Sequence, residues 1–159
     1  TGVDEAVASL YIEKPVVKKN RAVNTKKTVD YNNTPLGLAL IKPVDGIITS
    51  RFGNRSRGLH TGLDIATSGG TPIKCVAAGV VTYAGYKGSY GNLVVVSHGN
   101  GIETYYAHCR SIYVNAGDSV AQGTVLGGVG TTGNSTGNHL HLEIRVNGVA
   151  KNPQNYLYN

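Results

Sequence analysis

Short apolar runs separated by glycine-rich turns make up most of the sequence from residue 36 onward. The runs have the length of β-strands and recur about every ten residues. The expected strands are Ile47–Ser50, Leu63–Ile65, Val76–Tyr83, Leu93–Ser97, Ile102–Ala107, Ile112–Val114, Thr124–Val129 and Leu140–Val146. No long window keeps a helical period of 3.6 residues without an interrupting glycine. The pattern therefore predicts an all-β fold, an antiparallel sheet or sandwich.

Two Asn-Gly pairs indicate where strands turn back. Asn100-Gly101 separates two of the expected strands, and Asn147-Gly148 follows the last one. This dipeptide favours the tight turns that twist with a hairpin. We expect a β-hairpin at each pair.

The N-terminal part of the chain differs from the rest. The stretch 11–30 is charged, rich in valine and free of glycine, and Asn32 to Pro35 is typical of a turn or linker. A segment of this size cannot bury a core alone. We therefore expect residues 1–35 to be an N-terminal arm, or the tail of an upstream module with its linker, and residues 36–159 to be one domain.

Composition and charge exclude some classes of protein. The chain has 22 glycines among 159 residues, and 15 Lys and Arg against 9 Asp and Glu give a net charge of +6. This charge is spread along the chain, so it suits an anionic polymer such as a cell wall, or merely solubility. Clustered basic residues and an RNA-binding aromatic motif are missing, which argues against nucleic acid. No apolar run is long enough to span a membrane.

The two cysteines leave two interpretations open. Cys75 and Cys109 do not form a Cys-x-x-Cys pair, which excludes a zinc knuckle and a thioredoxin-type motif. They could form a disulfide in an oxidising compartment, or they could be two small buried hydrophobic residues.

The five histidines carry the candidate chemistry, and two close pairs stand out. His60 and Asp64 are four residues apart, a spacing that shares a face in either a helix or a strand. Gly62 between them argues against a helix. His139 and His141 project from the same face of a strand, with Leu140 on the opposite face. We expect these pairs to converge with His108, and His98 to be structural.

Two imidazoles and one carboxylate suit Zn²⁺ among biological metals. Three protein ligands leave a position for water, which is the pattern of catalytic rather than structural zinc. Such a site lowers the pKa of the water to about 7. The two remaining histidines would then act as general base and as stabiliser of an oxyanion. Spacing alone does not decide whether His139 or His141 binds the metal.

Three ordered motifs resemble those of the lysostaphin-type, or LytM-domain, zinc endopeptidases. They are HTGLD at 60–64, YAH at 106–108 and HLH at 139–141. Flanking pieces such as FGNR, GNLVVVSHGNG and the NP at 152–153 are similar too, so the resemblance covers about residues 42 to 155. It implies a duplicated-hybrid-motif-like antiparallel sheet with long Gly-rich loops forming a substrate groove. It also implies hydrolysis of peptide bonds in bacterial peptidoglycan, in stem peptides or cross-bridges.

The resemblance also assigns roles to residues. It implies one Zn²⁺ per chain, with His60, Asp64 and His141 as the metal ligands. His139 and its partner His108 would be the catalytic residues.

Groove residues follow less directly. The Gly-rich segments 85–91 and 127–138 would form the groove walls, because glycine lets an extended peptide approach the backbone closely. Tyr86, Tyr90 and Asn138 are tentative substrate-binding residues. Glu143 and Arg110 flank the motifs, and we expect them on the surface or supporting the site.

The resemblance places the protein outside the cell or in the envelope of a bacterium, secreted or anchored by an upstream segment. The expected partner is a peptidoglycan peptide, and an envelope protein is a further candidate. The alternative is an envelope scaffold or regulatory protein with the same fold and an unused or gated zinc site. Relatives of that kind typically lose site residues, whereas this sequence retains all five, which favours the enzyme.

Overall fold

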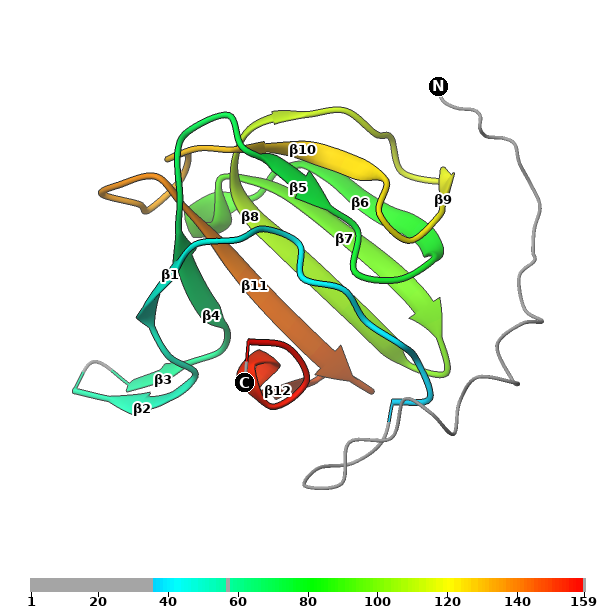
Figure 1. Cartoon of the computed structure of the whole chain (residues 1–159), viewed down its shortest axis with the longest axis horizontal. Coiled ribbons are helices and arrows are strands. Elements are labelled where there is room, and N and C mark those ends of the chain that lie inside the picture. Colours follow the sequence, from blue (N-terminus) through cyan, green and yellow to red (C-terminus); the bar gives the residue numbers. More distant parts are fainter. Residues whose placement is uncertain (1–35, 57, 159) are drawn as a thin grey trace.

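The computed structural model describes residues 36–56 and 58–158, and the regular secondary structure of this part is almost entirely antiparallel β-strand (Figure 1). The strands are β1 (Ile47–Ser50), β2 (Gly53–Arg55), β3 (Gly58–His60), β4 (Leu63–Ala66), β5 (Pro72–Lys74), β6 (Gly79–Tyr86), β7 (Asn92–Gly99), β8 (Ile102–Ile112), β9 (Ser119–Val120), β10 (Val125–Val129), β11 (His139–Val146) and β12 (Val149–Lys151). The described part also contains two short 3₁₀ helices, η2 (Gly88–Tyr90) and η3 (Pro153–Asn155). The predicted all-β fold is confirmed.

Two further expectations concern the N-terminal segment and the membrane. The expected N-terminal arm, 1–35, lies outside the described residues, so that division of the chain stays a prediction. In the described part, no helix is long and apolar enough to cross a membrane.

The strand bounds differ from the predicted ones for local reasons. The expected strand from Val76 begins only at Gly79, because the Val76 N–H donates to the Tyr106 hydroxyl rather than to a neighbouring strand. Ile112 ends β8 instead of starting a strand of its own. The strands that the pattern did not predict (β2, β3, β5, β9 and β12) have two or three residues each. Alternation cannot be recognised over so few positions.

Both predicted hairpin turns are present. Asn100 and Gly101 connect β7 to β8 with φ angles of 53° and 78°, and Asn147 and Gly148 connect β11 to β12 with 53° and 82°. Positive φ at both central positions defines the type I′ turn, which asparagine and glycine adopt at low cost.

The main sheet runs in the order β1-β4-β11-β8-β7-β6-β9, so β11 lies between β4 and β8 (Figure 1). Strand β8 is long enough to have two sets of partners. Its first part pairs with β11 and β7, and its last residues, from Cys109, pair with β10, which also pairs with β5. In Figure 1, β5 and β10 cross in front of β6 and β7.

The hydrophobic core fills the space between the main sheet and the β5–β10 pair. One buried cluster joins Ile73 of β5 and Leu126 of β10 to Leu63, Leu140 and Leu142 of the main sheet. Because side chains alternate along a strand, these leucines turn the intervening polar residues to the other face. The face of β4 and β11 that points away from the core is therefore where the chemistry-bearing side chains gather.

The hydroxyl of Tyr106 is a polar group buried in the core. Tyr106 is fully buried; its hydroxyl accepts a hydrogen bond from the Val76 N–H at 3.1 Å and lies 2.7 Å from the Thr104 hydroxyl oxygen. Thr104 also contacts Nε2 of His98 at 2.8 Å, and Nδ1 of His98 lies 2.8 Å from the carbonyl of Ala78. His98 is thus held within the fold, as expected for a structural histidine.

We predict that Tyr106→Phe lowers the free energy of unfolding by about 1–3 kcal/mol, because it leaves the buried Val76 N–H without its acceptor. Urea titration of both proteins measures the difference. Tyr113→Phe is the matched control, since the Tyr113 ring is 61% exposed and its hydroxyl should matter little. Equal losses in the two variants would contradict the role given to the Tyr106 hydroxyl.

Candidate metal centre and active site

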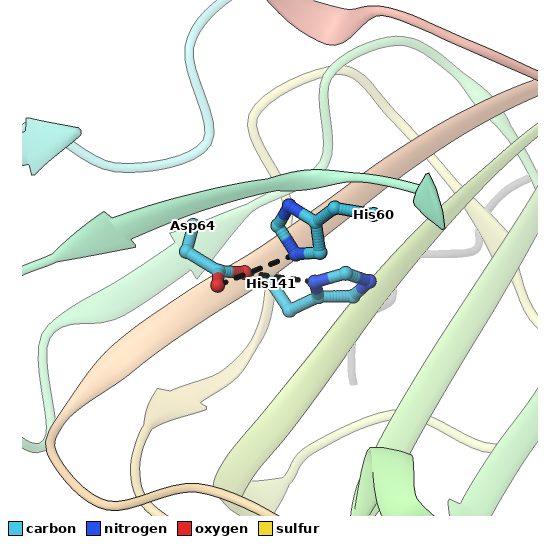
Figure 2. Close-up of side chains that lie close together, drawn as sticks. All are labelled: His60, Asp64 and His141. Atoms are coloured by element: carbon cyan, nitrogen blue, oxygen red, sulfur yellow. Dashed lines mark hydrogen bonds and ion pairs between the residues drawn. The ribbon is translucent and has the colours of Figure 1, made fainter. Parts of the chain in front are cut away.

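The register of two antiparallel strands creates the centre of the site. His141 of β11 lies directly opposite Asp64 of β4, and both face away from the core. His60, at the end of β3, completes the group (Figure 2). Ligand atoms of these three side chains all lie within 4.8 Å of one another. Two imidazoles and a carboxylate at this separation could hold one metal ion.

His60 is oriented by a backbone carbonyl. Its Nδ1 lies 2.9 Å from the Arg51 carbonyl oxygen, so Nδ1 carries the proton and donates it. The other ring nitrogen, Nε2, lies 3.4 Å from Oδ2 of Asp64 (Figure 2). Pairing of β2 with β3 holds His60 opposite Gly53. The nitrogen that faces the cluster is therefore the one free to bind a cation.

His141 presents the opposite nitrogen. Its Nδ1 lies 2.8 Å from Oδ1 of Asp64, and its Nε2 lies 2.8 Å from Oε2 of Glu143. Glu143 is fully buried, and its other oxygen pairs with the Arg145 guanidinium at 2.7 Å. His141 is therefore placed between two carboxylates.

The local electric field favours a cation at this position. Burial alone would lower the pKa of His141, but its hydrogen bonds to Asp64 and Glu143 outweigh burial and raise that pKa to about 9. Burial raises the pKa of Glu143, yet His141 and Arg145 bring it down to about 2. The pKa of Asp64 is lowered too, against the effect of burial, by its hydrogen bond to His141. The donor set and the field both fit a divalent metal ion.

Gly62 is required by the closeness of β11. A Cβ atom at this position would lie 2.5 Å from the carbonyl oxygen of Leu142 and 2.8 Å from Cε1 of His141. The glycine of HTGLD therefore lets the chain pass directly beside the His141 ring. The segment 60–64 bridges two strands, as the glycine predicted, rather than forming a helical turn.

His139 and His108 lie beside this group, with their rings 4.8 Å apart. Nδ1 of His139 lies 3.0 Å from the Gly137 carbonyl, and Nδ1 of His108 lies 2.7 Å from the Thr132 carbonyl. Each Nδ1–H therefore donates a hydrogen bond to the backbone, and in the neutral ring Nε2 is then the acceptor. Nε2 of His139 lies 3.7 Å from Oδ1 of Asp64. Burial lowers the pKa of His108, which favours its neutral form.

A β-bulge turns His108 to the site. Asn92 pairs with Cys109 and Val94 with Tyr106, so β8 contains one extra residue between these pairs. His108 has a φ angle of 63°, a left-handed conformation that is uncommon for a residue with a side chain. Simple alternation would point His108 into the core with Tyr106. The bulge instead lets Cys109 enter the core while His108 faces His139.

A cavity of about 560 Å³ opens over these residues. Beyond the histidines, its lining includes Ser89 and Tyr90 from one loop and Asn134, Ser135 and Thr136 from another. The loops are tied together by the Asn134 N–H, which donates to the Ser89 carbonyl at 2.9 Å. Both Gly-rich segments thus contribute walls to the cavity.

The tentative substrate-binding residues are placed differently from one another. Tyr90 lines the cavity, but its hydroxyl donates to Glu143 at 3.0 Å. Tyr86 is 64% exposed, and Asn138 lies beside Gly69; neither belongs to the cavity lining. A role of these three residues in binding a peptide stays a prediction.

Cys75 and Cys109 are free thiols in the structure, and both are buried. Burial raises the pKa of each thiol to about 12, so neither is a thiolate at neutral pH. Of the two earlier alternatives, the structure shows buried hydrophobic residues.

Residues 58–153 match Peptidase family M23. The chain belongs to this family. The catalytic domain of the antimicrobial peptidase lysostaphin from Staphylococcus simulans has a similar fold, with a TM-score of 0.64 and 30% identity over 67% of this chain and 88% of that domain. The resemblance that the three motifs indicated is confirmed.

Two M23 relatives have names that describe different activities. The DD-carboxypeptidase/endopeptidase Mpg of Neisseria meningitidis is 49% identical over 112 residues, which are 67% of this chain and 26% of Mpg. The murein hydrolase activator NlpD of Salmonella typhimurium is 39% identical over 116 residues, which are 72% of this chain and 30% of NlpD. The chain thus spans about a quarter to a third of the length of these relatives.

Two residues of the site were not assigned a site role from the sequence. Glu143 was expected on the surface or supporting the site, and the Thr61 hydroxyl, which donates to Oε2 of Glu143 at 2.9 Å, was not predicted. Alternation along 139–146 contained the signal, because it places Glu143 on the same face as His141. Its burial depends on Tyr90 and Arg145, and no sequence pattern shows those contacts.

We predict that Gly62→Ala weakens Zn²⁺ binding by at least about tenfold, because the new methyl group displaces His141 from Asp64. Competition with a chromogenic chelator measures the dissociation constant. Gly85→Ala is the control, since a Cβ atom there meets other atoms only at 3.7 Å or more. Wild-type affinity in Gly62→Ala would contradict the requirement for a glycine beside the His141 ring.

Proposed function

We propose that this M23 domain is a zinc-dependent endopeptidase that hydrolyses peptide bonds of bacterial peptidoglycan. The observation that supports this best is the convergence of five side chains on one cavity: His60, Asp64, His108, His139 and His141. Three of them form a group that could hold a metal ion, and two are histidines beside it whose Nδ1 is held by a backbone carbonyl. A purely structural site would not need the second pair.

His60, Asp64 and His141 would hold the ion, which when bound acts as a Lewis acid on the peptide carbonyl and makes water nucleophilic at neutral pH. His139 and His108 would accept the proton of the water and deliver it to the leaving amine. Because each donates Nδ1–H to a backbone carbonyl, each has its Nε2 lone pair available. One Nε2 accepts a proton as the water oxygen attacks the carbonyl carbon. The C–N bond then breaks, and the proton passes to the leaving amine.

The shape of the cavity supports an extended peptide as substrate. Its walls are loops with small and hydroxyl side chains, Ser89, Asn134, Ser135 and Thr136, which leave backbone groups accessible. Arg55 lines the same cavity and adds a positive charge. A peptide with few large side chains and free carboxylates fits this lining, and peptidoglycan stem peptides have that chemistry.

Such a substrate also sets the place of action. Peptidoglycan lies in the bacterial envelope, so the proposal places this domain there, secreted or anchored through another part of the protein. An envelope protein that controls access to the cavity is a compatible partner.

We predict that the Zn²⁺-loaded chain releases peptides from purified peptidoglycan, and that a chelator abolishes the release. Sacculi with direct cross-links and sacculi with glycine bridges are digested in parallel, and mass spectrometry identifies the bond that is cut. No release from either substrate by a zinc-loaded, folded chain would contradict the proposed activity.

We predict that substituting one class of histidine removes the metal and substituting the other does not. His60→Ala should lose Zn²⁺ and turnover together. His139→Ala and His108→Ala should retain Zn²⁺ and lose turnover by about 10²-fold or more. His98→Ala is the control outside the cavity and should keep both. Full turnover in His139→Ala and His108→Ala would exclude the proton-transfer role.

The second candidate is a regulatory protein, and the relative named as a murein hydrolase activator is the observation that favours it. The two functions separate in one assay. The chain is added to peptidoglycan alone and together with an independent murein hydrolase. Release only in the mixture, unaffected by His139→Ala, would support activation rather than hydrolysis.

A further inference from the structure

We propose that Glu143 is the positioning residue of the metal centre: it holds the proton of His141 on Nε2 and thereby makes Nδ1 the nitrogen that binds the metal. This inference rests on the metal site of the proposed function and adds a residue to it.

The first observation is that His141 is anchored unlike the other histidines of the cavity. His60, His108 and His139 each have Nδ1 within 3.0 Å of a backbone carbonyl, and they present Nε2. His141 has no such carbonyl partner. Its Nε2 lies 2.8 Å from Oε2 of Glu143, and its Nδ1 points to Asp64. The Glu143 side chain therefore orients the His141 ring, whereas backbone carbonyls orient the rings of the other three histidines.

The second observation is that both carboxylate oxygens of Glu143 already accept hydrogen bonds. Oε2 receives the Thr61 hydroxyl at 2.9 Å and the Tyr90 hydroxyl at 3.0 Å in addition to His141. Oε1 receives two nitrogens of Arg145, each at 2.7 Å. Its side chain is 0% exposed. A carboxylate whose oxygens are all occupied by donors is fixed in place and is poorly placed to act as a base toward substrate.

The third observation is that the surrounding residues come from separate elements. Thr61 belongs to the β3–β4 connection, Tyr90 to η2, and Arg145 to β11 itself. The Arg145 guanidinium also lies 4.9 Å from the centre of the Tyr105 ring, which fixes its direction. The carboxylate is thus held from three sides before any ion binds. Its fixed position defines the orientation of the His141 ring.

A carboxylate behind a ligating histidine has a known physical effect. It fixes the ring orientation and the tautomer and makes the opposite nitrogen more basic, and losing it typically costs about 10–100-fold in metal affinity. A side-chain amide in place of the Glu143 carboxylate would place N–H donors among side chains that are themselves hydrogen-bond donors. Glu143→Gln keeps the shape of the side chain, but it cannot accept all of the present hydrogen bonds.

The first test is the dissociation constant for Zn²⁺, measured by chelator competition on the full chain. We expect Glu143→Gln to weaken binding about 10–100-fold. Glu103→Gln makes the same change on the neighbouring strand β8, outside the cavity, and should bind Zn²⁺ as the wild type does. Equal affinities in the wild type and a folded Glu143→Gln protein would overturn the proposal.

The second test needs no substitution, so it decides the matter even if Glu143→Gln does not fold. Nitrogen-15 NMR of the Zn²⁺-loaded wild type distinguishes a protonated ring nitrogen from a metal-bound one. We expect the His141 proton on Nε2, exchanging slowly with water because Glu143 holds it. A proton on Nδ1, or an Nε2 proton that exchanges freely, would overturn the proposal.

The outcomes also separate this inference from the proposed function. A wild-type chain that binds no Zn²⁺ would remove both. A wild-type chain that binds Zn²⁺ and cleaves peptidoglycan, with Glu143→Gln equal to it in affinity, would remove only the role of Glu143.

Discussion

The site depends on the register between β4 and β11. Because Asp64 and His141 are directly opposite each other, their side chains leave the sheet on the same face. A shift of one residue would turn one of them into the core, where Leu63 and Leu142 now lie. The buried leucines on one face therefore specify the metal-binding geometry on the other.

Regular pairing explains only part of the cavity, and the other parts are departures from it. The extra residue in β8 brings His108 to the same side as His139, at a backbone conformation that costs about 1–2 kcal/mol in a residue with a Cβ atom. The connection from β3 to β4 passes close to His141 through Gly62. The core that surrounds Tyr106 supplies the stability that offsets these local costs. The bulge turns His108 into the cavity, and the glycine lets the β3–β4 connection pass beside His141.

Much of this could be predicted where a period or a turn signal exists. The shared face of His139 and His141 follows from alternation, and both hairpin turns follow from their Asn-Gly pairs. The very short strands carry no period, so they were missed, and a bulge such as the one at His108 has no signature in side-chain pattern. The sequence left open whether the two cysteines form a disulfide, because this depends on which strands pack together. Glu143 shared the predicted face, but its burial needed contacts from Thr61 and Tyr90, which are distant in the sequence.

The histidines of the cavity differ in how they are anchored, and this difference gives the site its chemistry. Backbone carbonyls fix the tautomers of His60, His108 and His139, and the Glu143 carboxylate fixes that of His141. The protein thus sets which ring nitrogen each histidine directs to its anchor and which it directs to the cavity. Membership of family M23 agrees with this arrangement.

The most direct test of the central claim is anomalous diffraction at the zinc edge from crystals of the Zn²⁺-loaded chain. The account predicts one strong peak between the side chains of His60, Asp64 and His141. A peak at another place, or none in this cavity at full zinc loading, would contradict it.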